Sequence, residues 1–169
     1  GVGGVSVLRD VMRRLPRERF IYYGDNLNAP YGTKSEAEIR ALAMRVADAL
    51  VARDVKALVV ACNTATSAAV ATLRETLSIP VVGMEPALKP ASLLWKGGKI
   101  LVLATPATLR QHKFQLLNEK YGAHALIRPC AGLMEFVESG DLTGEPVRAY
   151  LRDMLSDYEG VQLDAVVLG

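Results

Sequence analysis

Short apolar runs recur along the chain, and amphipathic segments separate them. The apolar runs predict strands at 19–23, 56–61, 80–84, 99–104, 123–128 and 164–169. The segments between them predict helices over 8–15, from Ser35 to Leu50, over 63–77, over 107–121 and, as a pair, over 132–158, with a further helix or hinge near Pro86. Ser35 and Glu38 form a capping box before the second of these helices, whose inner face carries Ile39, Leu42, Val46 and Leu50.

In a sheet with one solvent-exposed face, every second residue of a strand is usually polar, and the apolar runs lack this alternation. Such strands, alternating with helices, are typical of a parallel sheet covered by helices on both sides, so we predict an α/β protein. The strands "KALVVA" (56–61) and "DAVVLG" (164–169) have the same character, which favours two similar lobes. We expect lobes at 1–86 and 87–169, with a break near "GMEPALKP" and with the second lobe cut off at the end of its last strand.

Ligands of parallel α/β sheets bind beyond the carboxyl ends of the strands, so the loops at these ends hold the candidate site. They read "GDNLNAPYGTKS" (24–35), "CNTATS" (62–67) and "TPAT" (105–108), and all are rich in Gly, Thr, Asn or Tyr. None combines a lysine with a phosphate-binding glycine turn, and none carries paired carboxylates or a histidine cluster. We therefore predict no metal site and no cofactor.

Composition narrows the class of protein further. Half of the 169 residues are apolar, enough for a real core, and the formal net charge is only +2, which argues against a nucleic-acid partner. No uninterrupted apolar stretch reaches the ~18 residues of a membrane span. The two cysteines lie in unlike contexts and form neither a disulfide framework nor a metal motif, so we predict a reduced, cytoplasmic setting.

Cys62 is the candidate with the most distinctive surroundings. It ends a predicted strand and precedes a helix that opens with Asn63 and Thr64. A thiolate at a helix N-terminus, among hydrogen-bond donors, can act as a strong and soft base in proton transfer. A buried structural cysteine is the common alternative at a strand end, and the polar residues that follow Cys62 favour the catalytic interpretation. Cys130, in "IRPCAGL", has no such donors and is predicted to be structural.

Other candidates have simpler interpretations beside the functional one. The simpler interpretation of Thr105 and Thr108 is that they cap a helix and have no other role. Capping is compatible with ligand binding, because a helix N-terminus with additional hydroxyls also suits a carboxylate. Tyr31 could pack in a tight turn with Pro30 and Gly32. Asp25, in "YYGDN", lies in the same loop, where an Asp more often organises a turn than acts as a base.

Six motifs, taken together, resemble a known family. "GVGGVSVL", "YYGDNLNAPYGTKS", "ACNTATS", "PVVGMEPA", "LATPATLRQHKF" and "DAVVLG" occur in the order and spacing of glutamate racemases of the aspartate/glutamate racemase superfamily. The resemblance covers essentially the whole chain. It implies two pseudo-symmetric lobes with the active site between them, and cofactor-independent interconversion of L- and D-glutamate, which supplies D-glutamate for peptidoglycan. It implies proton transfer by two cysteines, one from each lobe.

The resemblance also implies roles for particular residues. Cys62 matches the first catalytic cysteine. The positions that match substrate-binding residues are Pro30, Tyr31, Gly32, Asn63, Thr64, Thr105 and Thr108. Family members carry an Asp-Ser pair before the first glycine loop and a Cys-Thr-His segment after the last strand, so we expect these to flank Gly1 and Gly169. The implied partner is glutamate, and a homodimer is left open.

Two other functions remain open at this point. One is a different racemase or isomerase of the superfamily, and the other is a non-catalytic amino-acid-binding module.

Overall fold

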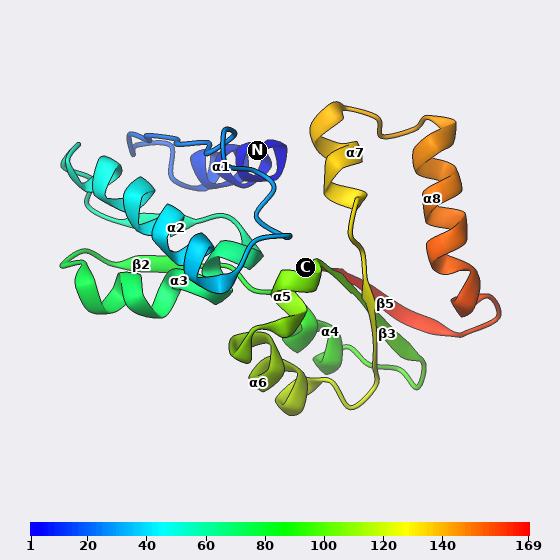
Figure 1. Cartoon of the computed structure of the whole chain (residues 1–169). Coiled ribbons are helices and arrows are strands. Elements are labelled where there is room, and N and C mark those ends of the chain that lie inside the picture. The colour runs from blue at the N-terminus through cyan, green and yellow to red at the C-terminus, as the bar shows by residue number, and fades with distance from the viewer. The chain divides into compact units, whose positions relative to one another are not determined.

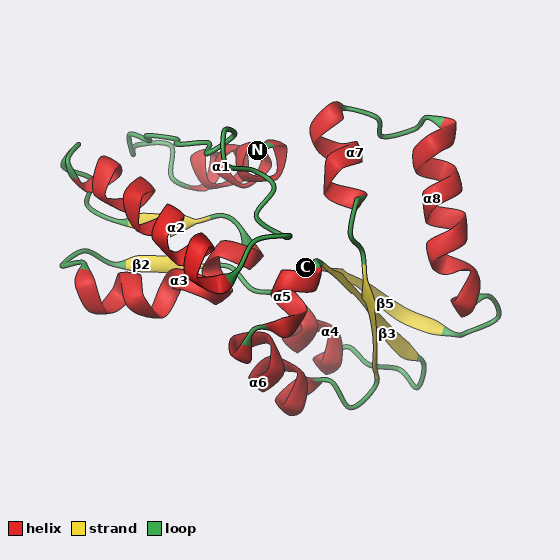
Figure 2. Ribbon diagram, in the orientation of Figure 1, coloured by secondary structure: helices red, strands yellow, loops and turns green.

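The computed structural model describes residues 1–169, which form two compact units, Gly1–Glu85 and Pro86–Gly169. Each unit combines helices with a small parallel sheet (Figures 1 and 2). The predicted α/β class, with parallel sheets flanked by helices, is therefore confirmed.

The first unit contains α1 (Val2–Arg14), α2 (Glu36–Val51), β1 (Leu58–Val60), α3 (Asn63–Thr76) and β2 (Val81–Gly83). Strands β1 and β2 run parallel, with Leu58 opposite Val81. Helices α2 and α3 pack together and build one core with the sheet, formed by Ala47, Leu50, Leu58, Ala69, Val70, Leu73 and Val81.

Helix α2 begins as its sequence predicts. The Ser35 hydroxyl accepts the Glu38 backbone N–H at 3.3 Å, and the Glu38 carboxylate accepts the Ser35 backbone N–H at 2.9 Å. These reciprocal bonds satisfy two backbone donors that a helix start leaves free. The capping box therefore fixes where the glycine- and tyrosine-containing loop ends and the helix starts.

The second unit contains a three-stranded parallel sheet in the order β4-β3-β5. Its elements are α4 (Leu88–Leu93), β3 (Lys99–Ala104), α5 (Pro106–Arg110), α6 (His112–Tyr121), β4 (Ala125–Pro129), α7 (Leu133–Ser139), α8 (Glu145–Leu155), a 3₁₀ turn (Ser156–Tyr158) and β5 (Leu163–Leu168).

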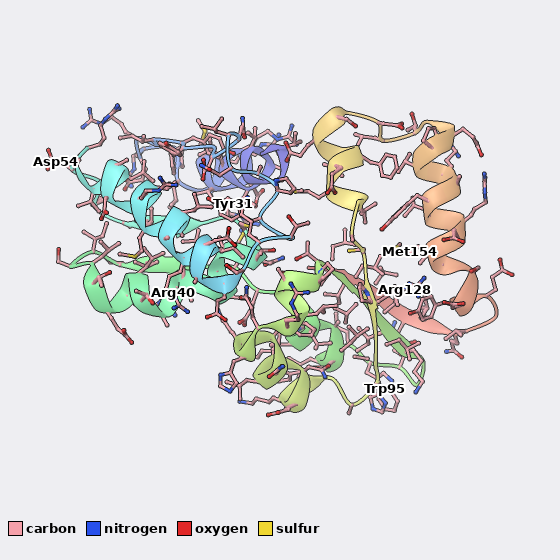
Figure 3. The ribbon with its side chains drawn as sticks, in the orientation of Figure 1. Tyr31, Arg40, Asp54, Trp95, Arg128 and Met154 are labelled. Atoms are coloured by element: carbon pink, nitrogen blue, oxygen red, sulfur yellow. The ribbon has the colours of Figure 1, made fainter.

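The central strand β3 is buried on both faces. Ile100 and Val102 join a core with residues of α4 and α6, whereas Leu101 and Leu103 join a separate core with Met154 of α8, labelled in Figure 3. Because successive side chains of a strand point to opposite faces, these two cores lie on opposite sides of the sheet. This explains why "KILVLA" reads as a continuous apolar run.

Three local predictions differ from the structure. Residues 19–23 are not a strand, because no neighbouring strand pairs with them, and Ile21 and Tyr23 are exposed. The first glycines are not a loop but part of α1. The helix expected over 107–121 is two helices, because Gln111 adopts an extended conformation between them.

No helix has both the length and the apolar character needed to cross a lipid bilayer.

Candidate active site

Cys62 occupies the N-cap position of α3, directly beyond β1. Its backbone is extended (φ −146°, ψ 122°), and its Sγ accepts the backbone N–H of Ala65 at 3.4 Å. The residue is exposed, so it is not the buried structural cysteine that a strand end commonly holds. The thiol therefore lies accessible at the start of a 14-residue helix, at the positive end of the helix dipole.

Thr66 anchors this strand-to-helix junction. Its hydroxyl donates to the Val60 carbonyl at 3.2 Å and accepts the Met84 backbone N–H at 3.0 Å. A side chain at Gly83 would bring a Cβ within 2.5 Å of Thr66 Cγ2, so only glycine allows β2 to approach this closely. Thr66 therefore joins the carboxyl ends of β1 and β2 to the first turn of α3, which positions Cys62.

Asn63 and Thr64 differ in how well their side chains are satisfied. Thr64 is buried, and its polar group has an interaction partner. The Oδ1 atom of Asn63 is buried without a hydrogen-bond partner. An unpaired buried acceptor is costly to a folded protein, so this atom is a natural position for a ligand donor.

The loop before α2 carries Tyr31. The Ala29–Pro30 peptide bond is cis, and a turn follows in which the Lys34 N–H donates to the Tyr31 carbonyl at 3.1 Å. The Tyr31 hydroxyl donates to the Asp25 carboxylate at 2.6 Å, and the Asn28 amide donates to the other carboxylate oxygen at 2.7 Å. Tyr31 is labelled in Figure 3.

The electrostatics of this loop follow from these contacts. Burial raises the pKa of Tyr31 above its ordinary value of 10.0. The hydrogen bond to Asp25 and the negative charges of Asp25 and Cys62 raise this pKa further, and the positive charge of Arg45 lowers it by less. Burial also raises the pKa of Asp25, but the hydrogen bonds from Tyr31 and Asn28, with the charge of Arg45, outweigh it and hold this pKa below its ordinary value. Tyr31 is therefore a neutral phenol, and Asp25 an anion, at neutral pH.

In the second unit, Thr105 and Thr108 lie at the end of β3. Thr105 is the N-cap of α5 and accepts the Thr108 backbone N–H at 3.2 Å, while the two hydroxyl oxygens lie 3.1 Å apart. Thr108 is fully buried. The capping role considered from the sequence therefore exists, and the Thr105 hydroxyl is the more accessible of the two.

Cys130 also lies at the carboxyl edge of this sheet, where its N–H donates to the Ala104 carbonyl at 3.0 Å. Its side chain is buried in the apolar cluster with Leu101, Leu103 and Met154. Burial raises the pKa of its thiol, which favours the neutral form. These surroundings are those of a structural cysteine.

The candidate residues thus fall into two groups. The first unit holds Pro30, Tyr31, Gly32, Cys62, Asn63 and Thr64, and the second holds Thr105 and Thr108. Within the first group, the negative charge of Cys62 is one of the causes that raise the pKa of Tyr31, after burial and the contact with Asp25. Sequence reasoning missed the bond from Tyr31 to Asp25, since nothing in "GDNLNAPYG" shows how the loop folds back on itself.

Two further features bear on what the site can bind. No group of three or more His, Cys, Asp or Glu side chains has an arrangement that could hold a metal ion. A cavity of about 300 Å³ in the second unit is lined by Leu109, Phe114, Gln115, Asn118, Glu119 and Ile127, none of which is a candidate residue. This cavity contains no nucleophile, so the thiol is the better centre for chemistry.

Parallel sheets with polar loops at their carboxyl ends, and an accessible thiol at a helix start, define an α/β protein with a cysteine-centred site. The family model for Asp/Glu/hydantoin racemases matches residues 3–169. The chain belongs to this family.

Curated relatives are glutamate racemases. The protein from Clostridium acetobutylicum is 53% identical over 172 residues, covering 100% of this chain and 67% of the relative. The protein from Clostridium botulinum is 49% identical over 171 residues, covering 100% and 66%. The chain thus spans about two thirds of the length of the curated relatives it matches.

Solved structures agree in fold. Escherichia coli glutamate racemase, in complex with L-glutamate and the activator UDP-MurNAc-Ala, matches with a TM-score of 0.89 and 33% identity, over 100% of this chain and 65% of that one. Francisella tularensis glutamate racemase, in complex with D-glutamate, matches with a TM-score of 0.81 and 30% identity, over 98% and 63%.

Proposed function

We propose that this protein is a glutamate racemase that interconverts L- and D-glutamate without a cofactor, and that Cys62 is one of its two bases. The observation that carries the proposal is the exposed Cys62 thiol at the start of α3. Identity of 49% and 53% to curated glutamate racemases supports glutamate as the substrate.

In this mechanism Cys62 removes or returns the α-proton on one face of the substrate. Asn63 Oδ1, buried and unpaired, accepts an N–H of the substrate ammonium. Tyr31, Gly32 and Thr64 complete the binding site in the first unit, with Pro30 shaping the loop. Neutral groups suit this task, because they hold the charged amino acid without taking up its α-proton.

Thr105 and Thr108 of the second unit are proposed to bind a substrate carboxylate through the Thr105 hydroxyl. The second base is not Cys130, because that thiol is buried among apolar side chains and burial raises its pKa. The resemblance assigns this role to a cysteine in the segment that follows Gly169 in the family pattern.

We also propose the wider setting that the resemblance implies. The two units correspond to lobes of residues 1–86 and 87–169, the protein acts in the cytoplasm, and its D-glutamate enters peptidoglycan. Depleting the protein from its host should then stop growth unless D-glutamate is supplied.

The direct test follows both optical activity and isotope exchange in the full-length protein. L- or D-glutamate in deuterated water should racemise and gain one deuterium at the α-carbon, after extensive dialysis and without added pyridoxal phosphate. Glutamate binding without exchange would instead support an amino-acid-binding module. Faster exchange with aspartate or a hydantoin would support another racemase of the family.

A further inference from the structure

Thr66 binds three separate parts of the backbone of the first unit. Its hydroxyl donates to the carbonyl of Val60, the last residue of β1, at 3.2 Å, and accepts the N–H of Met84, directly after β2, at 3.0 Å. Its own backbone N–H donates to the Cys62 carbonyl at 2.8 Å. Thr66 is fully buried, so water cannot replace these bonds.

These bonds hold the backbone on both sides of the thiol. Val60 lies two residues before Cys62, and Thr66 lies directly after Ala65, whose N–H the Cys62 sulfur accepts at 3.4 Å. The position of the sulfur relative to the first turn of α3 depends on both flanks. A single hydroxyl, that of Thr66, fixes one flank to the other.

The connection between the two units is short and is held on both sides. The units divide between Glu85 and Pro86, and Met84, just before this division, is bonded to Thr66. On the other side, the Pro86 carbonyl accepts the N–H of Leu88, which is fully buried in the second unit. Only Glu85 separates the two held residues, so a displacement of the connection reaches Thr66 with little slack.

Strand β2 and helix α3 leave no room to absorb such a displacement. A Cβ at Gly83 would lie 2.5 Å from Thr66 Cγ2 and 3.0 Å from Val70 Cγ2. At the other end of the helix, Arg74 Nε donates to the Val81 carbonyl at 3.0 Å. The helix that starts at the thiol is therefore bonded to β2 near both of its ends.

We propose that Thr66 is a positioning residue for racemisation, which holds the Cys62 thiol in its reactive position and couples it to the connection between the two units. This inference rests on the proposed racemase function. Thr66 exchanges no proton with the substrate, because its hydroxyl is buried and donates to Val60. It acts only through the backbone that carries Cys62.

The kinetic test compares two substitutions of Thr66 in the full-length protein. Thr66→Val removes the hydroxyl, so kcat should fall about tenfold with a smaller change in KM, because a displaced base transfers protons poorly. Thr66→Ser keeps the hydroxyl and should retain most of kcat. Thr76→Val is a matched control, since the Thr76 hydroxyl donates to the Thr72 carbonyl at 2.8 Å at the other end of α3, and it should leave kcat unchanged.

Alkylation of Cys62 by iodoacetamide gives a readout that does not depend on turnover. A thiol at a helix start owes part of its reactivity to the backbone N–H groups of the first turn. Thr66→Val disturbs this alignment and should slow alkylation of Cys62 in the folded protein several-fold, measured by mass spectrometry of the peptide that carries it. A purely stabilising role of Thr66 would leave the rate unchanged, or raise it where the junction opens.

Gly83→Ala tests the coupling from the side of β2. The added Cβ meets Thr66 Cγ2, so it should lower kcat and slow alkylation of Cys62 as Thr66→Val does. Thr66→Ser lacks this methyl group, so Gly83→Ala should lose most of its effect in that background. This pair of substitutions also decides the question if Thr66→Val does not fold.

Two results would overturn the proposal: alkylation of Cys62 that is unchanged or faster in Thr66→Val, or an equal loss from Gly83→Ala with and without Thr66→Ser. Absence of racemisation in the unmodified protein would overturn the proposed function and the kinetic part of this proposal together. The alkylation rates would still judge by themselves whether Thr66 positions the thiol.

Discussion

The Sγ atom of Cys62 accepts the backbone N–H of Ala65, so the thiol that we propose as a base also caps helix α3. Cys62→Ser should preserve the fold, because serine is a preferred N-cap residue. It should abolish racemisation from both enantiomers, because a serine hydroxyl is far too weak a base at neutral pH. Polarimetry from each enantiomer measures this, and near-normal turnover by the variant would remove Cys62 from the mechanism.

The control for this substitution is Cys130→Ser. It places a hydroxyl in an apolar cluster and should cost about 1–3 kcal/mol of stability while leaving kcat of the folded protein unchanged. Comparing the two variants thus distinguishes a cysteine that takes part in the reaction, Cys62, from a cysteine that only packs in the core, Cys130.

Thr66 should prove important for stability. Thr66→Val keeps the shape of the side chain but leaves the Met84 N–H and the Val60 carbonyl without this partner in a fully buried position. We expect a loss of about 1–3 kcal/mol in the free energy of unfolding, measured by urea denaturation. Thr76→Val, at an exposed position of the same helix, should change it by less than about 0.5 kcal/mol; equal effects at both positions would contradict this role.

Local signals explain which elements the sequence predicted well. The capping box of Ser35 and Glu38 and the apolar run 99–104 depend on neighbouring residues, and both are present as predicted. Residues 19–23 have the composition of a strand but no partner, because strand pairing depends on distant parts of the chain. For the same reason, the exposure of Cys62 and the bond from Tyr31 to Asp25 appear only in the folded structure.

Thr108 is predicted to affect catalysis through Thr105. Thr108→Val removes a buried hydroxyl 3.1 Å from the Thr105 hydroxyl, which then loses a partner that orients it. We expect kcat/KM for glutamate to fall several-fold, an effect of about 1 kcal/mol, with the fold intact. Thr105→Ser keeps the capping hydroxyl and should have a smaller effect. An unchanged kcat/KM in Thr108→Val would limit Thr108 to the structure of α5.

The Asp25 carboxylate should make stability depend on pH. Its pKa is lower in the folded protein than its ordinary value of 3.8, so its bonds stabilise the fold above that value. This contribution is lost as the pH falls through the folded pKa, where the carboxylate becomes protonated. The stability difference between the unmodified protein and Asp25→Asn should therefore be largest near neutral pH and shrink below pH 3.8 in urea titrations at several pH values. A difference that grows on acidification would contradict the assigned direction.

Asn63 should trade stability against substrate binding. Its buried Oδ1 atom lacks a hydrogen-bond partner, which costs the unliganded protein about 1–3 kcal/mol. Asn63→Ala removes this atom, so the unliganded variant should be at least as stable as the unmodified protein. A bound ammonium group would normally satisfy the same oxygen, so the variant should gain less thermal stability from glutamate and show a higher KM.

Asn118 provides the matched control for this trade. Its Oδ1 atom is also buried and unpaired, but it lies on α6 of the second unit, among none of the candidate residues. Asn118→Ala should therefore leave both the stabilisation by glutamate and KM unchanged. The measurement is a set of melting curves, with and without glutamate, for the unmodified protein, Asn63→Ala and Asn118→Ala. If Asn63→Ala lowers the stability of the unliganded protein and keeps the full effect of glutamate, the amide is a structural group and another acceptor binds the ammonium.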